Sequence, residues 1–148
     1  MRVMMLLKAD RKSEAGTLPT REHLADMGKL VEDMAKAGVL LAADGLHPSV
    51  KGKRIAYAGG KITSVTDGPF AETKELIAGF CMIQAESWED VMDWSRRFAA
   101  IQGNGECELR PLFEPSDFPE EVFPAEDAAR EQALREELQR KAGKAATY

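Results

Sequence analysis

Hydrophobic and polar positions follow two different periods along the first third of the chain. A continuous apolar run over residues 2–9 predicts a strand that is buried on both faces. From Thr20, a suitable N-cap, apolar side chains recur at the spacing of a helix, and the run stops at Gly38. Residues 39–46 then predict a second strand, which ends before Pro48. The chain therefore opens with a strand, a helix and a strand.

The middle of the chain predicts a hairpin. Residues 53–58 and 61–66 are two short strand-like runs on either side of Gly59-Gly60, and two glycines between strands are the signature of a two-residue turn. Residues 79–86 predict a further strand, which a charged and turn-rich loop separates from the hairpin.

A second helix and a last strand complete the pattern. Ser87 with Asp90 three residues later predicts a capped helix start, and Gly103 ends the helix. Its apolar side chains recur at helical spacing and predict a buried stripe: Val91, Trp94, Phe98 and Ile101. Residues 106–114 then alternate as a final strand. This order is an α+β, ferredoxin-like split β-α-β pattern with an inserted β-hairpin.

Such a fold is a sheet with two helices on one face, so something must cover the other face. A second copy of the chain is the economical cover, which predicts a homodimer. After Pro115 the character of the chain changes, and residues 125–144 predict a strongly charged helix. We therefore expect a ferredoxin-like domain over residues 1–114, followed by a connecting segment and a C-terminal helix over residues 115–148.

Composition narrows the class of protein. The 148 residues are 44% hydrophobic and 30% charged, which is typical of a globular protein. The net charge of -5 argues against a nucleic-acid partner, and no apolar run is long enough to span a membrane. Cys81 and Cys107 form no CxxC pair, which favours a cytoplasmic location over a disulfide scaffold. Two histidines and no acidic cluster predict no metal, and no cofactor motif is present.

The densest chemistry lies in residues 67–75, Asp-Gly-Pro-Phe-Ala-Glu-Thr-Lys-Glu. In a functional interpretation, Asp67, Glu72 or Glu75 acts as acid, base or anchor, and Lys74 holds an anionic oxygen. In a structural interpretation, Asp67 bonds to the turn, Phe70 fills the core and Lys74 pairs with a carboxylate. Both interpretations stay open at this stage.

Three residues outside the loop are further candidates. His47 follows the second strand, where an imidazole could reach the same cavity and transfer a proton, although a surface histidine is the commoner case. Arg110 in the last strand could bind an anionic ligand or pair with Glu75. His23 on the first helix is a less favoured candidate for a catalytic role than His47. We predict a catalytic set of four residues and a ligand-binding set of three: Asp67, Lys74, Glu75 and His47, and Phe70, Glu72 and Arg110.

The nine residues from Asp67 to Glu75 resemble the motif after which the DGPFAETKE family, a branch of the YCII-related proteins, is known. Gly79-Phe80, residues 45–48 and residues 108–111 also resemble the pattern of the family. The resemblance implies a ferredoxin-like subunit that dimerises into an α+β barrel. Members are often encoded beside extracytoplasmic-function sigma factors. Related proteins have a proposed His-Asp site, to which His23 could correspond, but the spacing identifies no aspartate partner.

Two functions from different classes are consistent with these residues. The first is a small-molecule-binding protein, with cofactor-independent acid-base catalysis in a pocket between the sheet, the hairpin and the 67–75 loop. The second is a non-enzymatic regulatory or interaction protein linked to a sigma-factor response. The first predicts that the ionisable groups converge on a cavity, and the second that they lie at the surface or in ion pairs.

Overall fold

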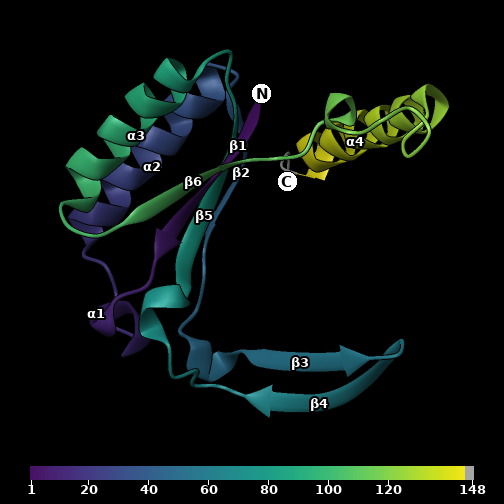
Figure 1. The fold of residues 1–148 in the computed structure, drawn as a ribbon. Helices are drawn as coiled ribbons and strands as arrows, with labels where there is room; N and C mark the ends of the chain where they lie inside the picture. Colours follow the sequence, from purple (N-terminus) through teal and green to yellow (C-terminus); the bar gives the residue numbers. More distant parts are fainter. Residues whose placement is uncertain (146–148) are drawn as a thin grey trace. The chain divides into compact units, whose positions relative to one another are not determined.

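The computed structural model describes residues 1–145, and the chain divides into two compact units, Met1–Leu112 and Phe113–Tyr148. The first unit contains a four-stranded antiparallel sheet in the order β2-β5-β1-β6 and a separate two-stranded hairpin, β3-β4 (Figure 1). The strands are β1 (Arg2–Lys8), β2 (Leu40–Gly45), β3 (Lys53–Ala58), β4 (Lys61–Asp67), β5 (Ile77–Gln84) and β6 (Cys107–Pro111). The helices of this unit are α1 (Arg11–Glu14), α2 (Arg21–Lys36), α3 (Trp88–Gln102) and two short 3-10 turns, η1 (Ser49–Lys51) and η2 (Thr73–Glu75). The fold is α+β and ferredoxin-like, as the sequence predicts.

The core lies between the sheet and the two long helices, α2 and α3, which cover one face of the sheet (Figure 1). Val3, Ile83 and Val91 are fully buried there, at 0% exposure. The stripe predicted on α3 is confirmed, because Val91 belongs to this core and Trp94, Phe98 and Ile101 pack against it.

Burial alternates along the central strand β1. Val3 and Met5 are buried beneath the helices, whereas Met4 and Leu6 point to the opposite face and are only half-buried. The prediction that residues 2–9 are buried on both faces is therefore wrong for the single chain. Successive side chains of a strand point to opposite faces, and the helices cover only one of them.

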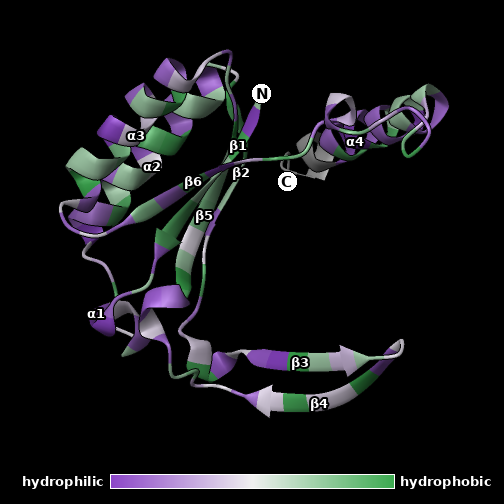
Figure 2. Ribbon diagram, in the orientation of Figure 1, coloured by the Kyte–Doolittle hydropathy of each residue, from purple (hydrophilic) through white to green (hydrophobic). Residues whose placement is uncertain are grey.

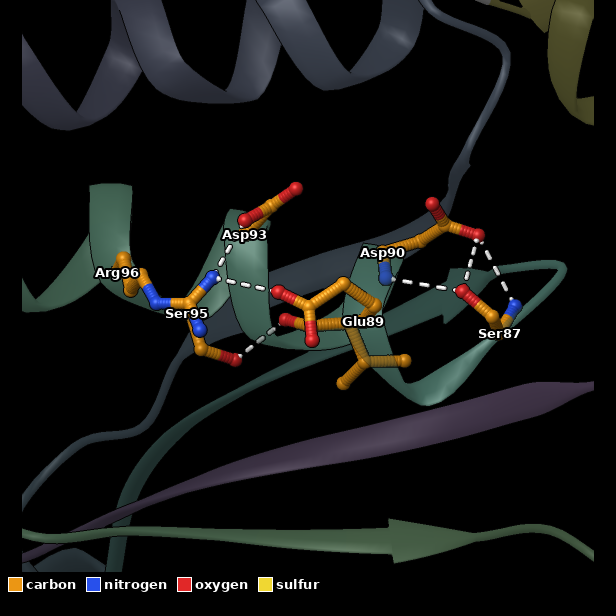
Figure 3. Close-up of polar contacts among 7 residues, drawn as sticks. Ser87, Glu89, Asp90, Asp93, Ser95 and Arg96 are labelled. Carbon is orange, nitrogen blue, oxygen red and sulfur yellow. Dashed lines mark hydrogen bonds and ion pairs between the residues drawn. The ribbon is translucent and has the colours of Figure 1, made fainter.

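The helix ends follow the predicted capping. Thr20 Oγ1 accepts a hydrogen bond from the backbone N–H of His23 at 3.1 Å, and Gly38, just beyond α2, has a positive φ of 72°. Ser87 and Asp90 form a reciprocal capping box at the start of α3 (Figure 3). Both helix starts are thus determined by local residues.

On the outer face of α3, Arg96 lies between Glu89 and Asp93 and forms ion pairs with both (Figure 3).

The predicted hairpin is also confirmed. Gly59 and Gly60 both have positive φ, at 56° and 77°, as a two-residue turn of this kind requires. The base of the hairpin, at Asp67, is connected to β5 by the loop of the nine-residue motif, which contains a cis peptide bond between Gly68 and Pro69.

The second unit contains a 3-10 turn, η3 (Pro115–Asp117), and the helix α4 (Ala125–Ala145). Three phenylalanines pack together before the helix, with ring centroids 5.2 Å apart for Phe113 and Phe118 and 5.8 Å apart for Phe118 and Phe123. Along α4, Glu137 pairs with Lys141 at 2.6 Å. Within residues 1–145, no helix is both long and apolar enough to cross a membrane.

Candidate functional site

A pocket of about 980 Å³ lies within the first unit, between α2, the sheet and two connecting segments. Residues 12–20, which follow β1, and residues 44–48, which follow β2, form much of its wall. This volume is in the range of small-molecule sites. The pocket is therefore on the helix side of the sheet, whereas the sequence predicted one beside the hairpin.

The interior and the mouth of the pocket are both mainly apolar. Met27, Trp94 and Phe98 line the interior from the two helices. Large apolar side chains also line the mouth and are exposed there: Leu18, Leu24, Leu46 and Val50. An apolar mouth in contact with water is typical of a surface that binds a ligand or a partner.

Both histidines of the chain line this pocket. His23 lies in the first turn of α2 and is half-buried, and His47 follows β2 and is exposed. Asp10 and Asp44 are also lining residues, but Asp44 pairs with Phe80, so its side chain lies on the open face of the sheet. Because Asp10, His23 and His47 come from three separate segments, the fold brings together acid-base groups that the sequence keeps apart. Asp10 and Asp44 were absent from the predicted site, and no spacing signal marks them.

The predicted residues of the motif lie elsewhere. Of the described residues that line the pocket, only His47 belongs to the predicted set of seven. Asp67 is exposed and forms an ion pair with Lys53 across the base of the hairpin. Lys74 and Glu75 are exposed in η2, and Glu72 is the exposed residue that precedes this turn.

Phe70 and Gly68 hold the motif loop against η1. The backbone N–H of Phe70 donates to Ser49 Oγ at 3.0 Å, and its ring carries the guanidinium of Arg54 at 4.1 Å from the centroid. A Cβ on Gly68 would lie only 1.7 Å from the backbone oxygen of Ser49. Glycine is therefore required at this position by the close approach of another backbone.

Ser49 connects the motif loop to the wall of the pocket. Its hydroxyl donates to Glu14 Oε2 at 2.5 Å, and its backbone N–H donates to Glu14 Oε1 at 3.1 Å. Glu14, in α1, lines the pocket, as do Pro48 and Val50 on either side of Ser49. Gly68 and Phe70 of the motif thus contact Ser49, which in turn binds Glu14 in the pocket wall.

Arg110 lies on the open face of the sheet, away from the motif. Its Nε is 3.7 Å from Glu108, and Lys8 binds the same carboxylate at 2.9 Å. The hydrogen bond from Lys8 holds the pKa of Glu108 below its usual range. Arg110 therefore pairs with Glu108, and the carboxylate of Glu108 neutralises part of the charge of Arg110.

Cys81 and Cys107 are free thiols that also line the pocket. Burial, and secondarily the charge of Cys107, raises the pKa of Cys81 to about 11. Burial also raises the pKa of Cys107. Since only the thiolate is a good nucleophile, both side chains act as apolar lining at neutral pH. Nowhere in the described part of the chain do three His, Cys, Asp or Glu side chains cluster so that they could hold a metal ion.

Comparison with known proteins identifies the family of the chain. The model of the family described as YCII-related domain matches residues 1–116. A protein of Rhizobium meliloti (strain 1021), described as uncharacterized, is 32% identical over 99 residues, which cover 65% of this chain and 79% of the relative.

Among solved structures, one similar chain is 5-chloro-2-hydroxyhydroquinone dehydrochlorinase from Burkholderia phenoliruptrix AC1100, in complex with 2,5-dihydroxybenzoquinone. The match has a TM-score of 0.45 and 12% sequence identity, and it covers 80% of this chain and 100% of that chain. The two chains share too little sequence for their residues to be matched.

Proposed function

Because this chain belongs to the YCII-related domain family, we propose that it is a small-molecule-binding protein whose site is the pocket between α2 and the sheet. The observation that carries the proposal is that both histidines of the chain line one largely apolar pocket of about 980 Å³. Such a pocket fits an organic molecule that has an apolar body and a polar group directed to the rim.

Within this proposal, His23 and His47 are the groups suited to proton transfer. Imidazole is the side chain whose ordinary pKa lies closest to neutral pH, and no bound cofactor is needed for acid-base chemistry. Asp10 supplies a carboxylate in the same pocket. Of the predicted catalytic set, His47 stays in the proposed site. Asp67, Lys74 and Glu75 lie outside it, and Asp67 pairs with Lys53 at the base of the hairpin.

Ligand binding can be tested with 1-anilinonaphthalene-8-sulfonate, an apolar aromatic anion whose fluorescence rises in apolar sites. Since the chain has two histidines, two imidazole signals are expected in the NMR spectrum, and His23→Gln and His47→Gln assign them. We expect both signals to shift as the probe binds, and each substitution to weaken binding about 3- to 10-fold, the range for one lost polar contact.

A hairpin variant, Ser64→Thr, is the matched control for a substitution outside the pocket, because Ser64 is exposed and does not line it. Its affinity for the probe should match that of the wild type. If the probe binds and neither histidine signal moves, the pocket is not the site and the proposal is wrong.

We further propose that the protein is a homodimer in the cytoplasm. The open face of its sheet supports the dimer, since Met4 and Leu6 are only half-buried in the single chain. The two free thiols support the location. Sedimentation equilibrium at micromolar concentration should give the mass of two chains.

A regulatory or interaction protein is the second candidate. The observation that favours it is an exposed apolar face on the hairpin, where Tyr57 is 75% exposed. This role is compatible with ligand binding, because the hairpin and the pocket are different parts of the first unit.

A further inference from the structure

The hairpin β3-β4 has one apolar face that the first unit leaves uncovered. Ile55 pairs with Val65, and, beyond a shift of register between Ala56 and Tyr57, Tyr57 pairs with Ile62, so the four side chains share one face. Their exposed fractions are 56%, 57%, 75% and 61%, respectively. Figure 2 shows hydrophobic segments on both β3 and β4, with pale and hydrophilic segments between them. An isolated two-stranded hairpin is marginally stable in water, so this face requires a cover.

The opposite face of the hairpin is polar. Arg54 pairs with Thr66, and Ala56 pairs with Ser64, on the side away from Ile55 and Tyr57. The hairpin is thus amphipathic, with a single face for contact with another surface.

The motif loop holds this arm at its base. Asp67 forms an ion pair with Lys53, the Arg54 guanidinium lies over Phe70, and Gly68 packs against Ser49. The hairpin therefore starts from a base that is fixed on η1. An arm that is held in place before binding loses less conformational entropy when it binds.

We propose that the apolar face of the hairpin docks onto a second copy of this chain, where it covers part of the open face of the sheet. This inference rests on the proposed homodimer and names the element that closes it. The open face presents two cross-strand pairs, Met4 with Met82 and Leu6 with Phe80, and all four side chains are half-buried.

The position of the hairpin fits an exchange between two copies. In Figure 1 the hairpin extends from one end of the sheet, on the side opposite to α2 and α3, which is the side of the open face. In a two-fold dimer the same patches meet on both chains, so each hairpin can reach the sheet of the other chain. One contact then covers the two apolar faces that the single chain leaves open.

Charge is also complementary between the hairpin of one copy and the rest of the other. Residues 51–67 carry four basic side chains and one acidic side chain, whereas the whole chain has a net charge of -5. The basic hairpin of one copy is therefore attracted to the acidic remainder of the other.

The test compares two double variants by sedimentation equilibrium. Ile55→Thr with Tyr57→Thr alters the apolar face and places threonine, a β-branched residue that favours strands, at each position. Ala56→Thr with Ser64→Thr makes the matched change on the polar face. We expect a dimeric wild type, an at least tenfold larger dissociation constant for the apolar-face variant, and a change of less than twofold for the polar-face variant.

The other outcomes overturn the inference. If the apolar-face variant dimerises as tightly as the wild type, the hairpin does not form the contact, although the homodimer stands. If the wild type is a monomer, both proposals fail. If the monomer binds phosphatidylglycerol vesicles through the hairpin, a membrane is the partner and the inference is wrong.

A second measurement covers the case in which a variant does not fold. Hydrogen exchange of the wild type, followed across its dissociation constant, reports the hairpin amides directly. They should exchange more slowly as the concentration rises, and exchange that is independent of concentration would contradict the docking.

Discussion

Replacement of Gly68 by alanine should lower the free energy of unfolding by about 3 kcal/mol, because the new methyl group has no space. Its Cβ would lie 1.7 Å from the backbone oxygen of Ser49 and 2.5 Å from the carbonyl carbon. The same oxygen accepts a hydrogen bond from the backbone N–H of Gly52 at 2.8 Å. The two segments can separate only if this base of the hairpin is disrupted. Urea unfolding followed by circular dichroism measures the loss.

Gly28→Ala is the matched control for this substitution. Gly28 lies inside α2, and, apart from its chain neighbours and the backbone of the same helix, no atom comes within 4 Å of the position that its Cβ would occupy. Alanine should therefore stabilise the protein by about 0.5–1 kcal/mol, because it is the better helix former. Ser49→Ala keeps the backbone and removes the hydroxyl, and should cost about 1–2 kcal/mol for the bonds to Glu14 and Phe70. A loss below about 1 kcal/mol for Gly68→Ala would show that the close approach is not rigid.

The elements of the fold could be predicted because local residues determine them. Thr20, Ser87 and Asp90 cap their helices through hydrogen bonds that span three residues, and Gly59-Gly60 has the backbone that a tight turn needs. The burial of β1 could not be predicted in the same way. Met4 and Leu6 are as apolar as Val3 and Met5, and only the tertiary arrangement leaves them uncovered.

The site was less accessible to prediction than the fold. The motif attracts attention because ionisable groups are dense in it, yet Asp67 pairs with Lys53, and the strictest requirement in the loop is steric, at Gly68. Conversely, His23 and His47 are 24 positions apart in the sequence, with nothing local to connect them. Their shared pocket arises from the packing of α2 beside the end of β2. The one signal in the sequence that points to this pocket is the low number of histidines: with only two in the chain, both are candidates for one site.

The sulfur atoms of the pocket make the stability of the protein sensitive to alkaline pH. Burial raises the pKa of Cys81 to about 11, above the ordinary value of 9.0 that applies to the unfolded chain. Between these values the folded protein binds more protons than the unfolded chain, so the stability must fall as the pH rises. The contribution is fully present below about pH 9 and is lost by about pH 11. Two pKa units correspond to about 2.7 kcal/mol, and we expect about 2 kcal/mol for this half-buried side chain.

Cys81→Ala should remove this part of the pH dependence. Urea unfolding of the wild type and the variant at pH 8 and pH 10.5 gives the difference, since the lysines and tyrosines that titrate in the same range are common to both proteins. Cys107→Ala should flatten the profile too, because burial raises the pKa of Cys107 as well. Equal loss of stability in the wild type and in both variants would mean that the thiols are solvated in the folded protein. The pocket would then be wetter than its lining of Met27, Trp94 and Phe98 implies.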